Sequence, residues 1–184
     1  ITAMFDLVEK HEVSPGQVKK LRISMSPPAF DLHGGFARYK AKFDALLSTH
    51  YVAAVILHDR ELSLAQFEPA RYDDPKLRRF AAEQVEVKPD PSLTGVQALV
   101  EAETADGSTL AVRCDHPRGS AENPLSRAQV ENKFRTYAST RIAESHVDEV
   151  IDSVSRLEEL KSARRLMDML RAGDARRLRA SAAA

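Results

Sequence analysis

The sequence has little cysteine and no tryptophan: Cys114 is the one thiol in 184 residues. A single thiol excludes an internal disulfide and a zinc site built from several cysteines, so Cys114 is most simply a small apolar strand residue. No apolar run approaches the roughly 20 residues that a membrane-spanning helix needs. The formal charge is zero, with 27 basic and 27 acidic side chains, which gives no general attraction to nucleic acid or to anionic membranes. These absences predict a reduced, cytoplasmic protein.

Signs of a metal or nucleotide site are also missing. No two histidines have the spacing that would place both imidazoles on one helix face around a metal. Gly34 and Gly35 lack the surrounding pattern of a phosphate-binding loop. We therefore expect neither a metal nor another cofactor. The histidines are His11, His33, His50, His58, His116 and His146.

What is present is an ordinary globular composition, 43% hydrophobic and 29% charged. It suits one domain, or two small lobes that share a core. The first residues, ITAMFDLVEKH, already follow helical spacing without a preceding cap. We therefore expect the chain to enter in the middle of a helix, as a fragment of a longer protein or a separately encoded half would.

Hydrophobic periodicity and turn residues predict alternating elements in the first half of the chain. The first helix should end near His11, and a strand should cover residues 18–26. Residues 29–40 show no clean period, so an ordered loop is expected there. The nearly all-apolar stretch 43–57 predicts one long helix that is buried on most sides.

The middle of the chain predicts a sheet. Asp74 followed by proline should cap a short helix, and strands are expected near residues 84–88, 96–104 and 108–115. An Asp-Gly turn joins the last two strands as a hairpin. Because each of these two strands shows one apolar face at period 2, a small antiparallel sheet packed by helices is the simplest arrangement. The predicted fold class is α+β.

Helices are expected to follow the sheet. Ser126 followed by Gln129 is typical of a capping box, in which each residue satisfies a free amide of the first helical turn. Val130, Phe134 and Tyr137 then recur at i, i+4 and i+7, which predicts one buried face.

The last part of the chain gives weaker signals. Ser145 is expected to cap another helix, an apolar stripe continues to Leu170, and Gly173 is the expected stop before a frayed tail over residues 173–184. Seven lysines and arginines fall between residues 161 and 179. A solvated helix face is the simpler interpretation of these charges, and a surface that binds a partner or nucleic acid is the alternative.

Four consecutive polar side chains, Ser48, Thr49, His50 and Tyr51, interrupt the long apolar stretch. A buried hydroxyl without a partner costs about 1–3 kcal/mol, so these groups need partners. In the structural interpretation the first two bond to the backbone and the tyrosine belongs to the core. In the functional interpretation Tyr51 or His50 lies at a cleft as a proton donor or carboxylate binder. Arg118, in the loop before the closing helices, is a further candidate for contacting substrate, with a structural loop role as the alternative.

Several segments resemble the MmgE/PrpD family, which includes 2-methylcitrate dehydratases, cis-aconitate decarboxylases and iminodisuccinate epimerases. Ser48 and Tyr51 fall on matching positions of this family, and in relatives the tyrosine position borders the active-site cleft. The family's Lys-Phe pair, usually directly before the serine, lies several residues upstream at Lys42-Phe43. Order and spacing match over nearly the whole chain. The matching segments are LLSTHYVAAVILHDRELSLAQF, DDPKL, VEVKPD with the following Asp-Gly hairpin, and GSAENPLS followed by KF.

The resemblance implies an α+β lid domain over residues 1–125 and C-terminal helices over 126–172 that pack on an all-helical domain. It implies the C-terminal part of a lyase or isomerase, similar to 2-methylcitrate dehydratase, that needs no cofactor. Such enzymes act on a small di- or tricarboxylate by removing a proton next to a carboxylate. Among the candidate residues, Tyr51 would be catalytic.

The resemblance also implies further substrate contacts and partners. Ser48, His50 and Arg118 would bind the substrate, and the partners would be a helical domain or companion chain of the same enzyme, in a homodimer. The family's Lys-x-Tyr-Pro segment with its downstream histidine would precede Ile1, so this chain alone is expected to lack most catalytic groups. A non-catalytic interaction or regulatory subunit with the lid fold is the alternative. Dehydration, decarboxylation and epimerisation stay open, as does the substrate.

Overall fold

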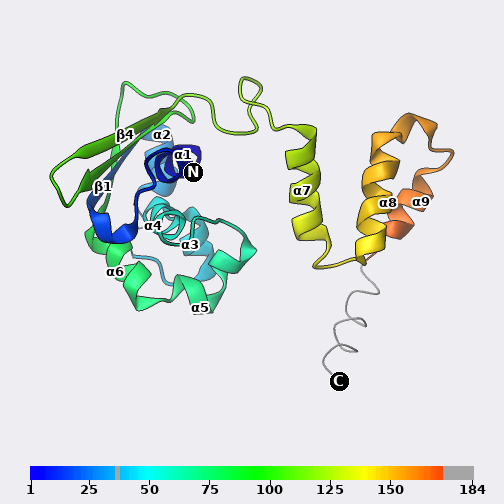
Figure 1. Ribbon diagram of the computed structural model, residues 1–184, viewed down its shortest axis with the longest axis horizontal. Helices are drawn as coiled ribbons and strands as arrows, with labels where there is room; N and C mark the ends of the chain where they lie inside the picture. Colours follow the sequence, from blue (N-terminus) through cyan, green and yellow to red (C-terminus); the bar gives the residue numbers. More distant parts are fainter. Residues whose placement is uncertain (36–37, 172–184) are drawn as a thin grey trace. The chain divides into compact units, whose positions relative to one another are not determined.

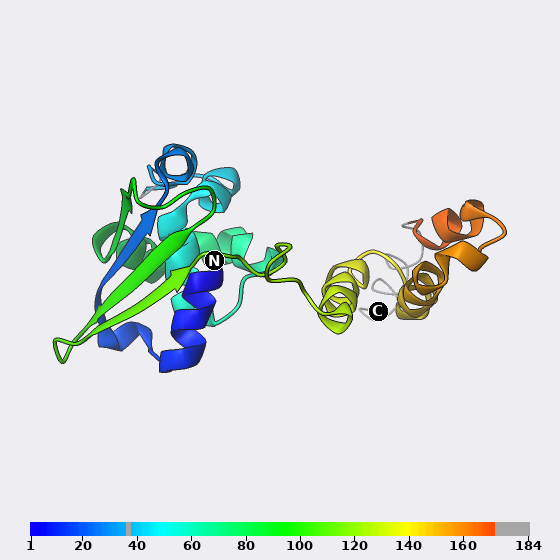
Figure 2. The ribbon, with the colours of Figure 1, turned by 90° about the horizontal axis from the view of Figure 1, so that it is seen from above.

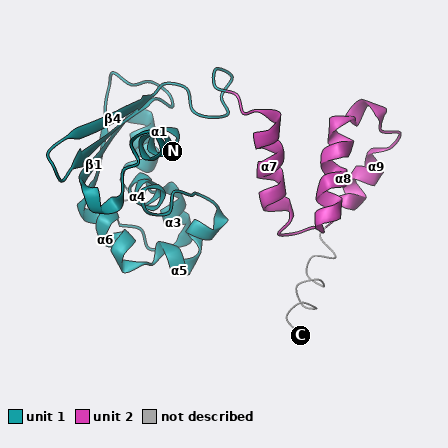
Figure 3. Cartoon of the chain, viewed as in Figure 1, with its two compact units in different colours: residues 1–123 teal, residues 124–184 magenta. Residues whose placement is uncertain are grey.

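A computed structural model describes residues 1–35 and 38–171. The chain divides into two compact units, Ile1–Asn123 and Pro124–Ala184 (Figure 3). In the described part, the first unit holds the sheet and the second is helical. The predicted stop at Gly173 and the predicted frayed tail lie outside the described residues.

The first unit is built on a four-stranded sheet with strand order β2-β1-β3-β4. β1 pairs antiparallel with β3, and β3 pairs antiparallel with β4 through the Asp-Gly turn. The prediction of an antiparallel sheet is wrong at one edge, because β2 runs parallel to β1. Parallel neighbours need a long crossover, and the helical segment between them supplies it. The sheet is mostly antiparallel and the α+β class is confirmed. The strands are β1 (Val18–Met25), β2 (Val85–Pro89), β3 (Ala98–Thr104) and β4 (Thr109–Cys114).

The sheet has one apolar and one charged face, as period-2 alternation predicts. Leu21 and Val100 are among the inward residues and are at most 2% exposed. On the opposite face, Arg22 donates to Glu103 at 2.8 Å. Helices α1 (Thr2–His11) and α4 (Thr49–Asp59) pack against the apolar face (Figures 1 and 2). Most of α4 is buried, which explains why its sequence is apolar on nearly all sides.

Two expectations for the segment before α4 are wrong. The expected loop begins with a helix, α2 (Pro27–His33), which starts with proline at its first position, where the missing N–H costs nothing. The expected single long helix is two helices, α3 (Lys42–Leu47) and α4, because Ser48 is extended (φ −79°, ψ 107°). Its hydroxyl accepts the amide of Tyr51, and this capping bond starts a new helix where periodicity alone predicts continuation.

Shorter helices complete the first unit. The predicted cap at Asp74 is confirmed, since its carboxylate accepts the amide of Lys76 at 2.8 Å. The apolar side of the helix that follows is buried in the same core as the sheet. The short elements of the first unit are the 3-10 turns η1 (Pro15–Gln17) and η2 (Leu64–Phe67) and the helices α5 (Pro69–Tyr72) and α6 (Pro75–Glu83).

The second unit contains α7 (Arg127–Ala138), α8 (Glu144–Ser155), the 3-10 turn η3 (Leu157–Glu159) and α9 (Ala163–Met169). The predicted capping box is confirmed: Ser126 accepts the amide of Gln129, and the Gln129 side chain accepts the amide of Ser126.

Two other expectations for the second unit are wrong. The predicted buried face of α7 is not buried in the described structure, because Val130 is 53% exposed and no residue of α7 is buried. Ser145 does not cap α8: the N-cap of this helix is Ala143, two residues before the predicted cap. No helix within residues 1–35 and 38–171 has the length and hydropathy to cross a membrane.

Candidate functional site

A cavity of about 230 Å³ lies in the first unit, where α1, the turn between α3 and α4, and strands β1 and β3 meet. We call it the corner cavity. Aliphatic and methionine side chains form most of its lining, and the polar side chains on it are His33, Ser48 and Thr49. A concave apolar surface with a few placed polar groups is typical of sites that bind small molecules.

Ser48 forms part of the wall of the corner cavity. The residue is fully buried, its Oγ accepts the amide of Tyr51 at 3.0 Å, and its carbonyl accepts the amide of Val52 at 2.9 Å. The same residue therefore caps α4 and lines the cavity. Of the residues expected to bind substrate, the structure brings Ser48 to this cavity.

Tyr51 points elsewhere. Its ring is fully buried between Tyr39 and Phe67, with edge-to-face centroid distances of 4.9 and 5.8 Å. Its hydroxyl donates to the carbonyl of Gln66. Burial, together with the neighbouring Tyr39, raises the pKa of Tyr51 well above its ordinary value. The phenol therefore keeps its proton at neutral pH, and it does not line the corner cavity.

The acceptor of the Tyr51 hydroxyl is held by a polar network. The Gln66 side chain donates to Asp59 at 3.4 Å, and Arg71 donates from Nε to the same carboxylate at 2.8 Å. A second Arg71 nitrogen reaches Asp74 at 2.7 Å. The hydrogen bond to Asp59 raises the pKa of the Arg71 guanidinium. The end of α4 and the start of α6 are thereby tied to the segment whose Gln66 carbonyl accepts the hydrogen bond of Tyr51.

Two buried polar atoms of the described structure have no hydrogen-bond partner, the hydroxyl of Tyr39 and Nδ1 of His50. Burial lowers the pKa of His50, so the imidazole is neutral at pH 7. Burial also raises the pKa of Tyr39 to about 12, opposed by Arg78, whose guanidinium lies 5.1 Å from the ring centre. Each orphaned group costs on the order of 1–3 kcal/mol. Neither residue lines the corner cavity.

Arg118 is tied to the first helix. Its guanidinium donates to Asp6 and to Glu9, each at 2.8 Å, and its backbone amide donates to the hydroxyl of Thr2 at 3.0 Å. The side-chain hydrogen bond to Glu9, followed by the one to Asp6, raises the pKa of the Arg118 guanidinium. In this structure the residue clamps the loop after β4 onto α1 and does not line the corner cavity.

Two residues on the corner cavity were not singled out by sequence reasoning, His33 and Thr49. His33 lies at the end of α2, and its Nδ1 is 3.3 Å from the carbonyl of Leu47. That contact joins residues 14 apart in different helices, so no local spacing could have indicated it. Thr49 was considered only as part of a polar run, and the helix break that turns it to the cavity was not predicted.

The second unit has an apolar groove of about 540 Å³ between α7 and α8. Val130, Phe134, Ile151 and Val154 are among its lining residues, with Arg127 and Glu131 paired at 2.7 Å on the same surface. Val130 and Val154 are each 53% exposed. Apolar exposure of this kind is typical of an interaction surface.

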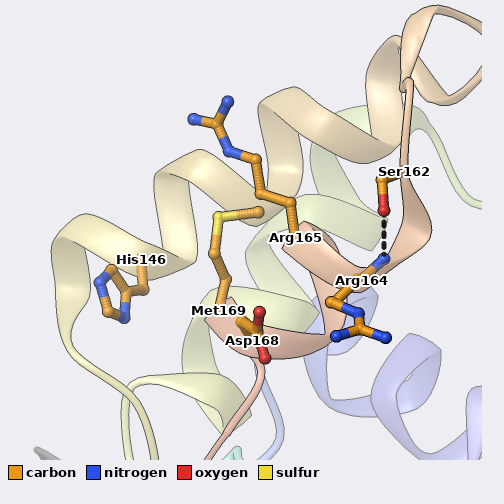
Figure 4. Close-up of a pocket in the computed structure, with 6 residues that line it drawn as sticks. All are labelled: His146, Ser162, Arg164, Arg165, Asp168 and Met169. Carbon is orange, nitrogen blue, oxygen red and sulfur yellow. Dashed lines mark hydrogen bonds between the residues drawn. The ribbon is translucent and has the colours of Figure 1, made fainter.

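A second hollow of this unit, of about 480 Å³, lies beside α9 (Figure 4). Ser162 caps α9 by accepting the amide of Arg164 at 3.3 Å. The side chains of Arg164 and Arg165 point in different directions (Figure 4), so they do not converge on one anion. His146, Asp168 and Met169 complete its lining. Over the described ranges, no three His, Cys, Asp or Glu side chains are grouped to hold a metal ion.

The first unit thus carries a small apolar cavity and the second an exposed apolar groove, features typical of a small-molecule site and of an interaction surface. The sequence model of the MmgE/PrpD C-terminal domain matches residues 1–159. The chain belongs to the MmgE/PrpD family, and it represents the C-terminal domain of that family.

Curated relatives are similar over most of this chain. Cis-aconitate decarboxylase from Homo sapiens is 28% identical over 134 residues, which cover 71% of this chain and 28% of the relative. The Mus musculus enzyme of the same name has the same identity and coverage. Cis-aconitate decarboxylase from Aspergillus terreus is 29% identical over 132 residues, 67% of this chain and 26% of the relative. The chain thus spans about a quarter of the length of these relatives.

Proposed function

We propose that this chain is the C-terminal part of a metal- and cofactor-independent lyase that acts on a small di- or tricarboxylate. The reaction would begin with removal of a proton next to a carboxylate, or with loss of carbon dioxide from that carbon. The family match over residues 1–159 carries this proposal. The relatives' names favour decarboxylation of an unsaturated tricarboxylate over dehydration or epimerisation.

The geometry of the corner cavity supports a small substrate. The cavity is large enough for a short carbon skeleton, and Ser48 and Thr49 place hydroxyl groups on its wall. We propose Ser48 as a substrate contact and Tyr51 as the proton donor. For Tyr51 this requires its hydroxyl to exchange the Gln66 carbonyl for the substrate when the rest of the enzyme covers this unit. His50 and Arg118 would also bind substrate, for which Arg118 would have to leave Asp6 and Glu9.

The proposed chemistry also needs groups from outside this chain. Carbanion or enolate formation requires a base and cationic groups that stabilise the developing charge. Among the described residues that line the corner cavity, His33 is the only ionisable side chain. We therefore propose that the base and the cations come from a helical domain or companion chain, in a homodimeric enzyme.

The α7–α8 groove is the proposed docking surface for that helical partner. An amphipathic helix would bury the exposed apolar side chains of the groove. Native mass spectrometry of the protein purified from its source tests this proposal. A longer polypeptide or a companion chain is expected, and a lone species of 20.4 kDa would contradict it.

The reaction is tested by incubating the native assembly with cis-aconitate, 2-methylcitrate and citrate and following products by NMR. We expect turnover of one tricarboxylate, with a loss of about hundredfold or more in Tyr51→Phe. Tyr39→Phe is the matched control, since it removes a hydroxyl that has no partner. Unchanged turnover in Tyr51→Phe would remove Tyr51 from the mechanism and leave family membership untouched.

One observation favours a second candidate function, a non-catalytic interaction or regulatory subunit. Arg118 is already paired, the Tyr51 hydroxyl is already bonded, and His50 is buried. A companion chain without turnover of any tested carboxylate would support this alternative.

A further inference from the structure

We propose that His33 is a carboxylate-binding residue of the corner cavity; this inference rests on the proposed function and deepens it. His33 is the last residue of α2 and is half-buried on the cavity lining. Its Nδ1 lies 3.3 Å from the carbonyl of Leu47, one residue before Ser48. A carbonyl can only accept a hydrogen bond, so Nδ1 carries the proton and donates. Nε2 is then an acceptor in the neutral ring and a donor in the imidazolium.

The structure fixes both ends of α2, the helix that carries His33. At the start of α2, the Ser26 hydroxyl donates to the carbonyl of Gly95 at 2.6 Å, which ties the helix to the loop before β3. At its end, the amide of Gly34 donates to the carbonyl of Phe30 at 2.7 Å. A β-carbon on Gly34 would collide with the Phe30 ring. Gly34 has ordinary helical backbone angles (φ −80°, ψ −24°), so glycine is needed here for space: it lets the aromatic ring cover the helix end directly after His33.

The lining of the cavity selects an anion with a short carbon skeleton. Among the described residues that line it, none has an acidic side chain, and His33 is the single side chain that can become a cation. The hydroxyl-bearing residues Ser48 and Thr49 lie on the same wall, at the N-terminus of the eleven-residue helix α4. The positive end of that helix favours negative charge beside the imidazole. Apolar walls then accommodate the methylene or alkene carbons of a small carboxylic acid.

The test uses the full 184-residue chain and citrate as the probe. Histidine ring signals labelled with 13C are followed by NMR during a citrate titration. We expect the His33 signal to shift saturably, while the exposed His116 signal shifts less and without saturation. Replacing His33 with glutamine keeps a donor for the Leu47 carbonyl but removes the second ring nitrogen, and should weaken citrate binding about tenfold, the loss expected for a hydrogen bond to a charged group. His116→Gln is the matched control and should leave the affinity unchanged.

The outcomes separate this inference from the proposed function. A His33 signal that does not respond, or unchanged citrate affinity in His33→Gln, would overturn the carboxylate site even if the native assembly turns over a tricarboxylate. Saturable binding that His33→Gln weakens would support the site even if the assembly shows no turnover. Gly34→Ala offers a second variant that keeps the imidazole: it should displace His33 and weaken binding. Full affinity in Gly34→Ala, with the chain still folded, would also contradict the account.

Discussion

At the scale of residues, Ser48 and Tyr51 are one helical turn apart yet serve different surroundings. Ser48 lines the corner cavity, whereas the Tyr51 hydroxyl donates to Gln66 within a buried polar network. Sequence reasoning placed both residues at one site because they share a motif. Which face of α4 each side chain occupies depends on the helix start at Ser48, and that start is set by the Ser48 cap, which hydrophobic periodicity does not indicate.

The cap at the start of α4 gives a first prediction. Replacing Ser48 with alanine leaves the amide of Tyr51 without its side-chain acceptor, so the free energy of unfolding should fall by about 1 kcal/mol. Urea denaturation measures the change. Thr49→Ala is the control, since that residue lines the same cavity without capping the helix, and an equal loss in both variants would contradict the capping role.

The buried imidazole of His50 gives a prediction on pH. Its folded-state pKa lies below the ordinary value of 6.5 because of burial. As pH falls, His50 is therefore protonated in the unfolded chain before it is protonated in the folded chain. Its contribution to stability is fully present above about pH 6.5 and is lost as pH drops below that value. The melting temperature should therefore fall as pH is lowered from about 7.5 to about 5.5, a range that brackets the ordinary histidine pKa. The decline should be smaller in His50→Gln than in His116→Gln, and equal slopes would refute this assignment.

At the scale of elements, some helix caps were predictable from local chemistry, whereas the packing was not. The caps at Asp74 and Ser126 depend on side chains within three residues of the helix start, so the sequence indicates them directly. The parallel pairing of β2 with β1 was missed because it depends on the crossover between them. The apolar stripe on α7 is real, but periodicity cannot say what covers it, and Val130 is largely exposed.

The cap of α6 gives a prediction at this scale. The Asp74 carboxylate accepts the amide of Lys76 and pairs with Arg71 at 2.7 Å, and the backbone hydrogen bond holds its pKa below the ordinary value. Asp74→Ala should lower the free energy of unfolding by about 1 kcal/mol. Asp73→Ala, which loses an exposed pair with Arg78, should cost about 0.5 kcal/mol or less. Chemical denaturation of both variants checks the difference, and a reversed order would be inconsistent with the cap.

That stabilisation should also depend on pH in a defined direction. Because the folded-state pKa of Asp74 is lowered, its contribution is present above the ordinary value of 3.8 and is lost as pH falls through the folded-state value. The difference between the parent chain and Asp74→Ala should therefore shrink in acid. A difference that stays constant down to strongly acidic pH would mean that the charge of Asp74 plays no part.

At the scale of the whole molecule, the described part of the second unit has few buried apolar side chains. Its buried hydrophobic residues in the described part are Ile142, Val147, Val150 and Met169. Small units with so little buried apolar surface usually need a partner. Together with the span of about a quarter of its relatives' length, this supports the proposal that the chain works with further protein structure.

The apolar groove gives the prediction for this scale. Val130→Asp and Val154→Asp place charges on its exposed surface and should weaken binding of the helical partner by about tenfold or more each. Val96→Asp is the control, since Val96 is exposed in the first unit. Co-purification followed by native mass spectrometry measures the loss, and retention of the partner by both groove variants would exclude this groove as the docking surface.

Solvent deuterium incorporation tests the central claim most directly. The native assembly is incubated in D2O with cis-aconitate, 2-methylcitrate and citrate, and the carbons next to the carboxylates are read by NMR and mass spectrometry. The account predicts enzyme-dependent deuterium at such a carbon in the substrate or product of one of these acids, reduced in Tyr51→Phe. The absence of both incorporation into and consumption of any of these acids, by an assembly that contains its helical partner, would contradict a carboxylate lyase and favour the non-catalytic subunit.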